Sequence, residues 1–214
     1  RFSDRESAVD WTPTATNQAG GVQLSSGSEI IGALRTRQEI LIWTDVGIVS
    51  MRFVGEPFIF SFTEVAEGPS LIGPNAAVSA NNRVYFMDAG GFYAYSGSAE
   101  KIQCTVLDYV LSDLNQDQSF KVFAAVNNVA NEIMWFYPNA SSLEISSYVV
   151  YNYIEKVWYY GTLARQAWMD RGIRTLPIAT GGQYLYNHEV GYDDDGSAMT
   201  SFIESAPMDI GDGE

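Results

Sequence analysis

The acidic segment around residue 193 holds the densest group of carboxylates in the sequence. Asp193, Asp194 and Asp195 are consecutive, and Glu189 lies just before them. Carboxylate oxygens of this kind are the ligands that a hard cation such as Ca²⁺ accepts. Calcium loops alternate their ligands so that the side chains converge, whereas three consecutive aspartates point apart. The segment is therefore a candidate metal site whose spacing favours a solvated turn, and Asp209, Asp212 and Glu214 are interpreted in the same way.

The chain has one cysteine and one histidine, which form the only conceivable thiol–imidazole pair. Cys104 and His188 belong to different repeats of the sequence, so a buried cysteine and a structural histidine are favoured over a nucleophile and its base. A G-x-S-x-G motif, a phosphate-binding glycine loop and a marked pair of carboxylates are all absent from the sequence. The sequence thus indicates no catalytic residue and implies no cofactor.

Four aromatic residues are crowded near the end of the third repeat. Trp158, Tyr159, Tyr160 and Trp168 could stack on sugar rings or anchor a protein interface. The strands around them are apolar on both faces, so we expect most of these rings to be core residues.

One hairpin pattern recurs along the chain and organises these candidates. Arg83–Gly97 has two strands that are apolar on both faces, joined at a Gly-Gly pair. The pattern of the first strand of this hairpin returns as the equivalent inner-strand pairs Leu41/Trp43, Val84/Phe86, Ile133/Trp135 and Tyr184/Tyr186, at separations of 43, 49 and 51 residues. A period of about 40 to 50 residues in an all-β chain predicts a β-propeller.

The pattern predicts an irregular segment or the end of a preceding blade over residues 1–27, followed by a propeller domain over 28–214. We expect four four-stranded blades at about 28–66, 73–103, 119–162 and 165–210, with closing strands at 200–204 and 206–210. One amphipathic helix is expected at about 105–115, covering its own domain.

Composition excludes several classes of protein. The 214 residues include 26 acidic and 12 basic residues, so the net charge of −14 argues against nucleic-acid binding as the main task. A single cysteine cannot form an intrachain disulfide, and no apolar run reaches the length of a membrane span.

Six blocks, taken in order, resemble the tail tubular, or nozzle, proteins of short-tailed bacteriophages. The blocks are SDRESAVDWTP, SSGSEIIGALRTRQEILIWTD, GPSLIGPNAAVSANNRVYFM, CTVLDYVLSDLN, VVYNYIEKVWYYGTLAR and SFIESAPMDIGDG. The resemblance implies a non-catalytic virion protein that forms a ring-like homo-oligomer around the DNA channel and contacts an adaptor protein. Because nozzle proteins are longer and the chain starts without methionine, we expect it to be a fragment.

Other functions remain open on sequence grounds. A carbohydrate-binding propeller that recognises a host receptor and a propeller glycosidase are the alternatives to a tail component. The acidic charge has two interpretations, either a channel wall that lets DNA pass without binding or a surface that keeps the protein soluble.

Overall fold

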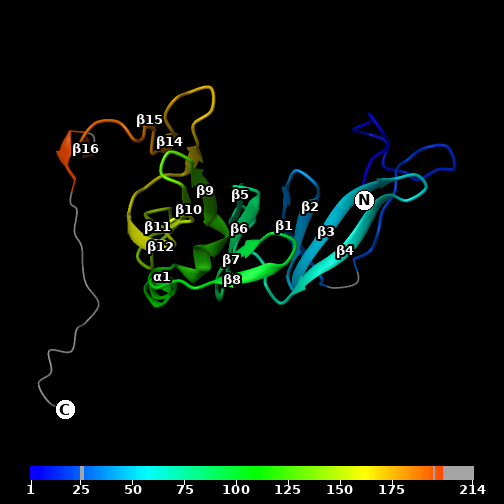
Figure 1. The fold of residues 1–214 in the computed structure, drawn as a ribbon, viewed down its shortest axis with the longest axis horizontal. Coiled ribbons are helices and arrows are strands. Elements are labelled where there is room, and N and C mark those ends of the chain that lie inside the picture. The colour runs from blue at the N-terminus through cyan, green and yellow to red at the C-terminus, as the bar shows by residue number, and fades with distance from the viewer. Residues whose placement is uncertain (25–26, 195, 200–214) are drawn as a thin grey trace, which may run out of the picture.

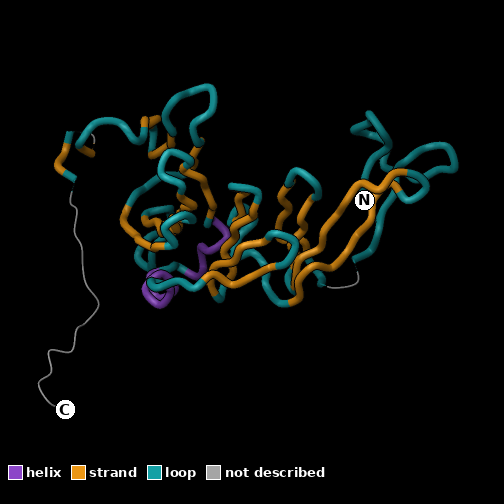
Figure 2. Tube along the Cα trace, viewed as in Figure 1, coloured by secondary structure: helices purple, strands orange, loops and turns teal. Residues whose placement is uncertain are grey.

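The structure is a computed structural model, and it describes residues 1–24, 27–194 and 196–199. Four antiparallel sheets and one short α-helix account for most of its regular structure (Figures 1 and 2). The first sheet contains β1 (Ile30–Arg35), β2 (Ile40–Thr44), β3 (Gly47–Gly55) and β4 (Ile59–Glu67), and the second contains β5 (Ala77–Ala80), β6 (Arg83–Asp88), β7 (Gly91–Tyr95) and β8 (Ala99–Ile102). The third contains β9 (Phe123–Asn127), β10 (Glu132–Tyr137), β11 (Ser147–Asn152) and β12 (Val157–Thr162), and the fourth contains β13 (Ala167–Met169), β14 (Ile178–Gly181) and β15 (Tyr184–Asn187).

Each sheet is a meander in which strands adjacent in sequence pair with one another. The tight turns follow from local chemistry. Asn81 and Asn82, between β5 and β6, have φ angles of 47° and 60°, which asparagine tolerates better than most residues. At the next turn the Asp88 carboxylate accepts a hydrogen bond of 2.6 Å from the Gly90 amide. These turns set the strand ends that the sequence pattern predicts.

The first strands of the successive sheets lie next to one another. β1 contacts β5, β5 contacts β9, and β9 contacts β13. An isolated parallel bridge between Asn75 and Phe123 links the second and third sheets near these strands. The sheets therefore follow one another as the blades of a propeller do, and Figure 1 shows them as an open row. The expectation of an all-β, propeller-like array of about four blades with one short helix is confirmed.

The second sheet packs on both sides, as the two apolar faces of its hairpin predict. Phe86 contacts Trp43 of the first sheet at 5.5 Å between ring centroids. On the other face, Tyr85 contacts Tyr151 of the third sheet at 6.3 Å. Both faces of β6 are buried, so the hydrophobic core lies between neighbouring sheets. No face of this strand is left to solvent, unlike the outer face of many antiparallel sheets.

The third sheet contains the most deeply buried strand. All six residues of β10 are buried. Trp135 packs on Phe92 at 4.7 Å and donates a hydrogen bond of 3.1 Å to the Ala76 carbonyl, so it joins the third sheet to the second. Met134 and Phe136 face the other way, into a smaller apolar cluster.

The prediction for the fourth repeat is wrong in one respect. The sequence pattern aligns Tyr184 and Tyr186 with the second strands of the other blades, but β13 precedes them as the first strand, so β15 is third. The Tyr184 side chain is 71% exposed, unlike Leu41, Val84 and Ile133, which are buried. β13 has three residues, too few to show a periodic pattern, and its omission shifted the register by one strand.

The helix prediction is confirmed with narrower bounds. α1 spans Leu107–Asp113, and a 3₁₀ helix follows at Gln116–Lys121. Val110 is buried, Leu114 joins the main core, and Tyr109 stacks on Tyr160 of β12 at 4.0 Å. The helix therefore covers its own domain. In the N-terminal segment, residues 1–24 contain no strand, only a bridge between Phe2 and Gly20. The closing strands expected at 200–204 and 206–210 lie outside the described residues.

Candidate functional site

The acidic segment forms a small hairpin. β16 (Asp193–Asp194) pairs with β17 (Ser197–Ala198), and the Asp193 carboxylate accepts a hydrogen bond of 3.0 Å from the Gly196 amide. The Asp194 side chain and all of Asp195, Asp209, Asp212 and Glu214 lie outside the described part of the chain. Within that part, no three histidine, cysteine, aspartate or glutamate side chains are placed to hold a metal ion. Asp193 has the role of a turn residue there.

Cys104 and His188 occupy different surroundings. Cys104 packs against the main core, and burial raises the pKa of its thiol to about 11, so the thiol is protonated at neutral pH. His188 lies beside Trp168 at 4.7 Å, and its Nε2 accepts a hydrogen bond of 3.0 Å from Arg165 Nε. Neither environment resembles that of an activated thiol.

The aromatic candidates separate onto different surfaces. Trp158 and Tyr160 alternate with Tyr159 along β12, so they face the opposite side of the third sheet. Trp158 donates a hydrogen bond of 2.9 Å to the Gln103 carbonyl and packs on Phe92 at 4.7 Å. The ring of Tyr109, on α1, covers Tyr160. These two rings therefore pack the core.

Trp168 lies on β13, away from the other three rings. Its indole donates a hydrogen bond of 2.8 Å to the Val126 carbonyl, and its ring lies 6.0 Å from Phe136. It is half-buried and packs on the smaller apolar cluster. The four aromatic residues consequently form no common stacking platform.

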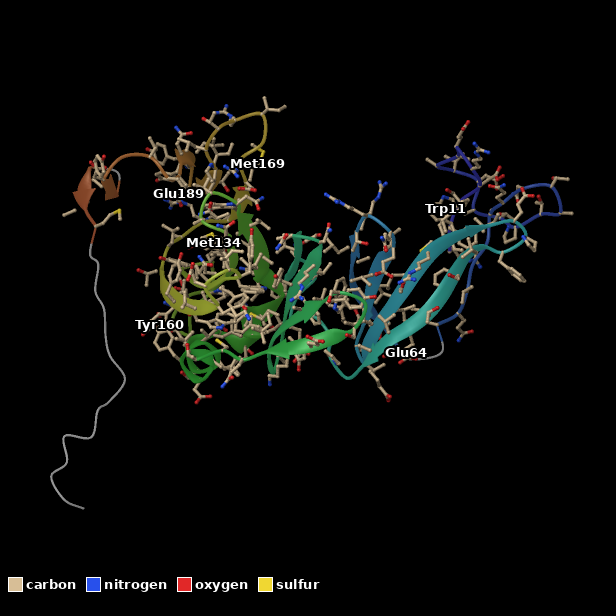
Figure 3. The ribbon with its side chains drawn as sticks, in the orientation of Figure 1. Trp11, Glu64, Met134, Tyr160, Met169 and Glu189 are labelled. Atoms are coloured by element: carbon tan, nitrogen blue, oxygen red, sulfur yellow. The ribbon has the colours of Figure 1, made fainter. Side chains whose placement is uncertain are left out.

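A polar network that the sequence did not reveal lies on the Tyr159 face of the third sheet. The Asn127 amide donates hydrogen bonds to Glu132 Oε2 at 3.4 Å and to Glu189 Oε1 at 2.9 Å. Burial, reinforced by the charge of Glu189, raises the pKa of Glu132, although hydrogen bonds from Tyr159 and Asn127 oppose the rise. Burial and the hydrogen bond to Glu132 likewise raise the pKa of Tyr159. Figure 3 shows Glu189 beside the third sheet.

Glu132 is expected to make the stability of the protein depend on pH. Because its folded-state pKa is raised, its contribution to stability is complete below the unfolded value of about 4.3 and is lost as the pH rises through the folded-state value. Glu132→Gln removes this titration, so the stability of the variant relative to wild type should be higher at pH 8 than at pH 4. Urea unfolding at both pH values measures the difference.

The matched control is Glu64→Gln, which alters an exposed carboxylate on β4 (Figure 3). It should give the same stability relative to wild type at both pH values. A Glu132→Gln variant that behaves like this control would contradict the assigned role of burial.

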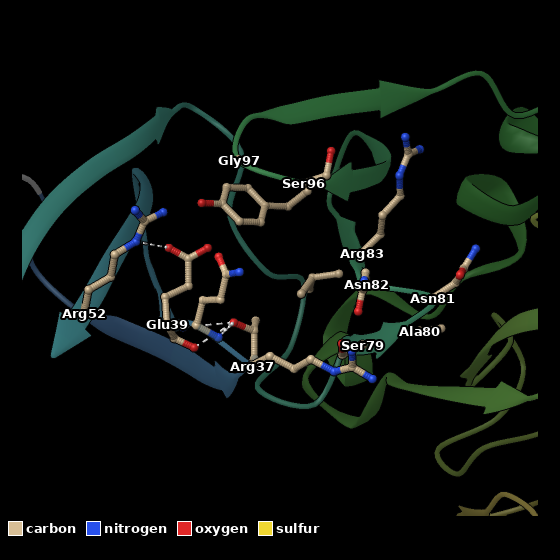
Figure 4. A pocket seen from close by; sticks show the side chains of 14 residues that line it. Arg37, Glu39, Arg52, Ser79, Ala80, Asn81, Asn82, Arg83, Ser96 and Gly97 are labelled. Carbon is tan, nitrogen blue, oxygen red and sulfur yellow. Dashed lines mark hydrogen bonds and ion pairs between the residues drawn. The ribbon is translucent and has the colours of Figure 1, made fainter.

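A polar cleft of about 460 Å³ separates the first sheet from the second; we call it the inter-sheet cleft (Figure 4). On its first-sheet side, Arg52 Nε donates a hydrogen bond of 2.9 Å to Glu39 Oε2, and the Ser50 hydroxyl donates to the same oxygen. Burial raises the pKa of Glu39, but the hydrogen bonds from Ser50 and Arg52 outweigh it and lower the pKa overall. Glu39 is therefore ionised, and its carboxylate is bound to Arg52 and Ser50.

A second hollow of about 360 Å³ lies where the first strands meet. Its lining residues come from all four sheets, and most of them are of apolar type. They include Leu34, Trp43, Leu71, Ala77, Phe123 and Trp168. The Trp43 indole nitrogen is buried and has no hydrogen-bond partner among the described residues.

The long β3–β4 hairpin exposes apolar side chains at its tip. Phe53 and Phe58 are 71% and 77% exposed, and Val54 is also exposed. Figure 1 shows this hairpin extending away from the other sheets beside the N-terminal segment. Phe60 packs between Phe2 and Phe53, at 4.9 and 5.8 Å, so the aromatic tip has a defined shape. We call Phe53, Val54 and Phe58 the hairpin tip.

Comparison with known proteins identifies no family. No family model matches the chain, and a search of curated proteins finds no match. In the described part of the chain, no helix is both long and apolar enough to cross a lipid bilayer.

Proposed function

We propose that this chain is a non-catalytic structural component of a phage tail, of the tail tubular or nozzle class that its sequence blocks resemble. The observation that carries the proposal is the hairpin tip, an aromatic surface that projects from a propeller-like array. Exposed apolar patches of this kind are typical of protein interfaces. Because the hairpin extends away from the other sheets, its tip can reach a neighbouring subunit, and the same contact can repeat from one subunit to the next.

In this proposal the subunits form a ring-like homo-oligomer in the virion, in contact with an adaptor protein. An interface that repeats head to tail closes into a ring when its rotation allows. The excess of carboxylates is consistent with a channel for DNA. A negatively charged channel wall repels phosphates, so DNA passes without specific binding. Portal, adaptor and terminase genes beside the gene for this chain are the genomic arrangement that the proposal expects.

Substitution of the hairpin tip is expected to break the oligomer. Phe53→Ser combined with Phe58→Ser removes two exposed rings without touching the core, so the far-ultraviolet circular dichroism should stay unchanged. Buried aromatic anchors commonly contribute 2 kcal/mol or more to association, so we expect at least about a tenfold weaker association. Sedimentation velocity and negative-stain electron microscopy measure the assembly state.

Leu143→Ser is the matched control, because Leu143 is equally exposed but lies in the turn after β10. It should assemble as wild type does. A wild-type chain that stays monomeric at tens of micromolar, or a double variant that assembles normally, would argue against the proposal.

A further inference from the structure

The inter-sheet cleft gathers positive charge in a strongly acidic protein. The chain has 12 basic residues against 26 acidic ones, yet Arg37, Arg52 and Arg83 all line this cleft. Among the described residues that line the cleft, Glu39 is the sole carboxylate, and it accepts hydrogen bonds from Arg52 and Ser50. The cleft therefore differs in sign from the average surface.

Among the described arginines that line the cleft, Arg37 and Arg83 have no ion pair. Arg52 is paired with Glu39, and in Figure 4 the Arg83 side chain extends away from Arg37. Arg37 forms no ion pair with any described carboxylate. In Figure 4 its side chain extends from the β1–β2 turn toward the side formed by Ser79 and Asn82.

Small neutral polar groups line the same cleft as Arg37. They are the hydroxyl and amide side chains of Thr36, Gln38, Ser79, Asn81, Asn82 and Ser96. In the described part of the chain, the side chains of Ser79, Asn81, Asn82 and Ser96 form no hydrogen bonds of their own. Asn81 and Asn82 are held by the tight β5–β6 turn, so their amides have a fixed starting position. Such groups can both donate to and accept from the hydroxyls of a ligand.

Tyr95 lines the cleft beside Glu39. The Tyr95 side chain is 3% exposed, and its hydroxyl has no hydrogen-bond partner of acceptable geometry among the described residues. Burial, with the nearby Glu39 carboxylate, raises the pKa of Tyr95 to about 12, so the group stays a donor at neutral pH.

We propose that the inter-sheet cleft binds a small anionic sugar, with one or two rings and a carboxylate or phosphate group. Arg37 pairs with the anionic group, because a guanidinium binds planar oxyanions through paired hydrogen bonds. Ser79, Asn82 and their polar neighbours bind the ring hydroxyls. The volume of about 460 Å³ lies within the range of small-molecule sites.

Isothermal titration calorimetry of the purified chain tests the site with four probes. Glucuronate and glucose 6-phosphate carry both parts of the proposed ligand, glucose carries only the hydroxyls, and inorganic phosphate carries only the charge. We expect at least one anionic sugar to bind at least tenfold more tightly than glucose and phosphate. The absence of binding by both anionic sugars, or phosphate binding as tight as that of glucose 6-phosphate, would overturn the proposal.

Paired variants locate the binding. Arg37→Gln should weaken anionic-sugar binding at least tenfold, whereas Arg35→Gln removes the same charge from an exposed position outside the cleft and should change it less than twofold. Asn82→Gly removes an amide while keeping the positive φ angle, and it should weaken binding of the sugar hydroxyls. Equal losses for Arg37→Gln and Arg35→Gln would show long-range attraction instead of a site. This assay is independent of the assembly state, so either proposal can fail alone.

Discussion

Trp135→Ala is expected to lower the free energy of unfolding by about 3–5 kcal/mol, the range for truncation of a large buried aromatic. Trp135 is fully buried on β10 and contacts Phe92 of the neighbouring sheet at 4.7 Å. Its removal opens a cavity between two sheets, which cannot close without moving both. Urea unfolding followed by circular dichroism measures the loss without relying on the deleted fluorophore.

Two further variants separate the cavity from the hydrogen bond. Trp135→Phe removes the indole donor but leaves the Ala76 carbonyl satisfied, because that carbonyl also accepts from the Met87 amide at 3.0 Å. Its loss should therefore be well below that of the alanine variant. Trp11→Ala is the control at a surface site and should cost less than about 1 kcal/mol. A loss of unfolding free energy below 1 kcal/mol for Trp135→Ala would contradict the assignment of Trp135 to the core.

Gly47→Ala is expected to destabilise the protein by about 1–3 kcal/mol, the typical cost of forcing an extra group into a packed interior. A Cβ atom at Gly47 would lie 2.4 Å from the Ala66 backbone oxygen, closer than real Cβ contacts occur. Because that atom belongs to the backbone of β4, the strand itself must shift. The pairing of Gly47 with Glu67 anchors the base of the long β3–β4 hairpin.

Gly172→Ala is the matched control, since no atom lies within 4 Å of the added Cβ. It should leave stability unchanged or raise it by up to about 1 kcal/mol, because alanine restricts the unfolded chain. Thermal unfolding of the two alanine variants compares them directly. Similar stabilities would mean that β4 accommodates the methyl group, contrary to the close contact.

The strands of the first three sheets could be predicted because their pattern is local. In β6, Val84 and Phe86 alternate with Tyr85 and Met87, and asparagine or glycine turns mark both ends. Alternation sets the two faces of a strand, and turn residues set its ends. The repeat of this pattern at intervals of 43 and 49 residues then predicts the propeller-like array.

The fourth sheet could not be predicted correctly because its first strand is too short. β13 has three residues, and only its contacts with β9 and its pairing with β14 identify it. The register of Tyr184 and Tyr186 therefore depended on a strand that the local pattern does not show. Tyr184 is exposed and Tyr186 is half-buried, whereas the second strands of the first three sheets are largely buried.

The sequence by itself determined the fold class, the helix and the buried pairs of the first three sheets, because periodicity and turn chemistry act between near neighbours. Only the tertiary structure decided which polar groups meet. Glu189 joins Asn127 and Glu132 of the β9–β10 hairpin from the segment after β15, and Arg37 reaches the inter-sheet cleft because β1 and β5 lie side by side. Their proximity depends on how the sheets pack, and packing between sheets leaves no signal in the spacing of residues along one chain.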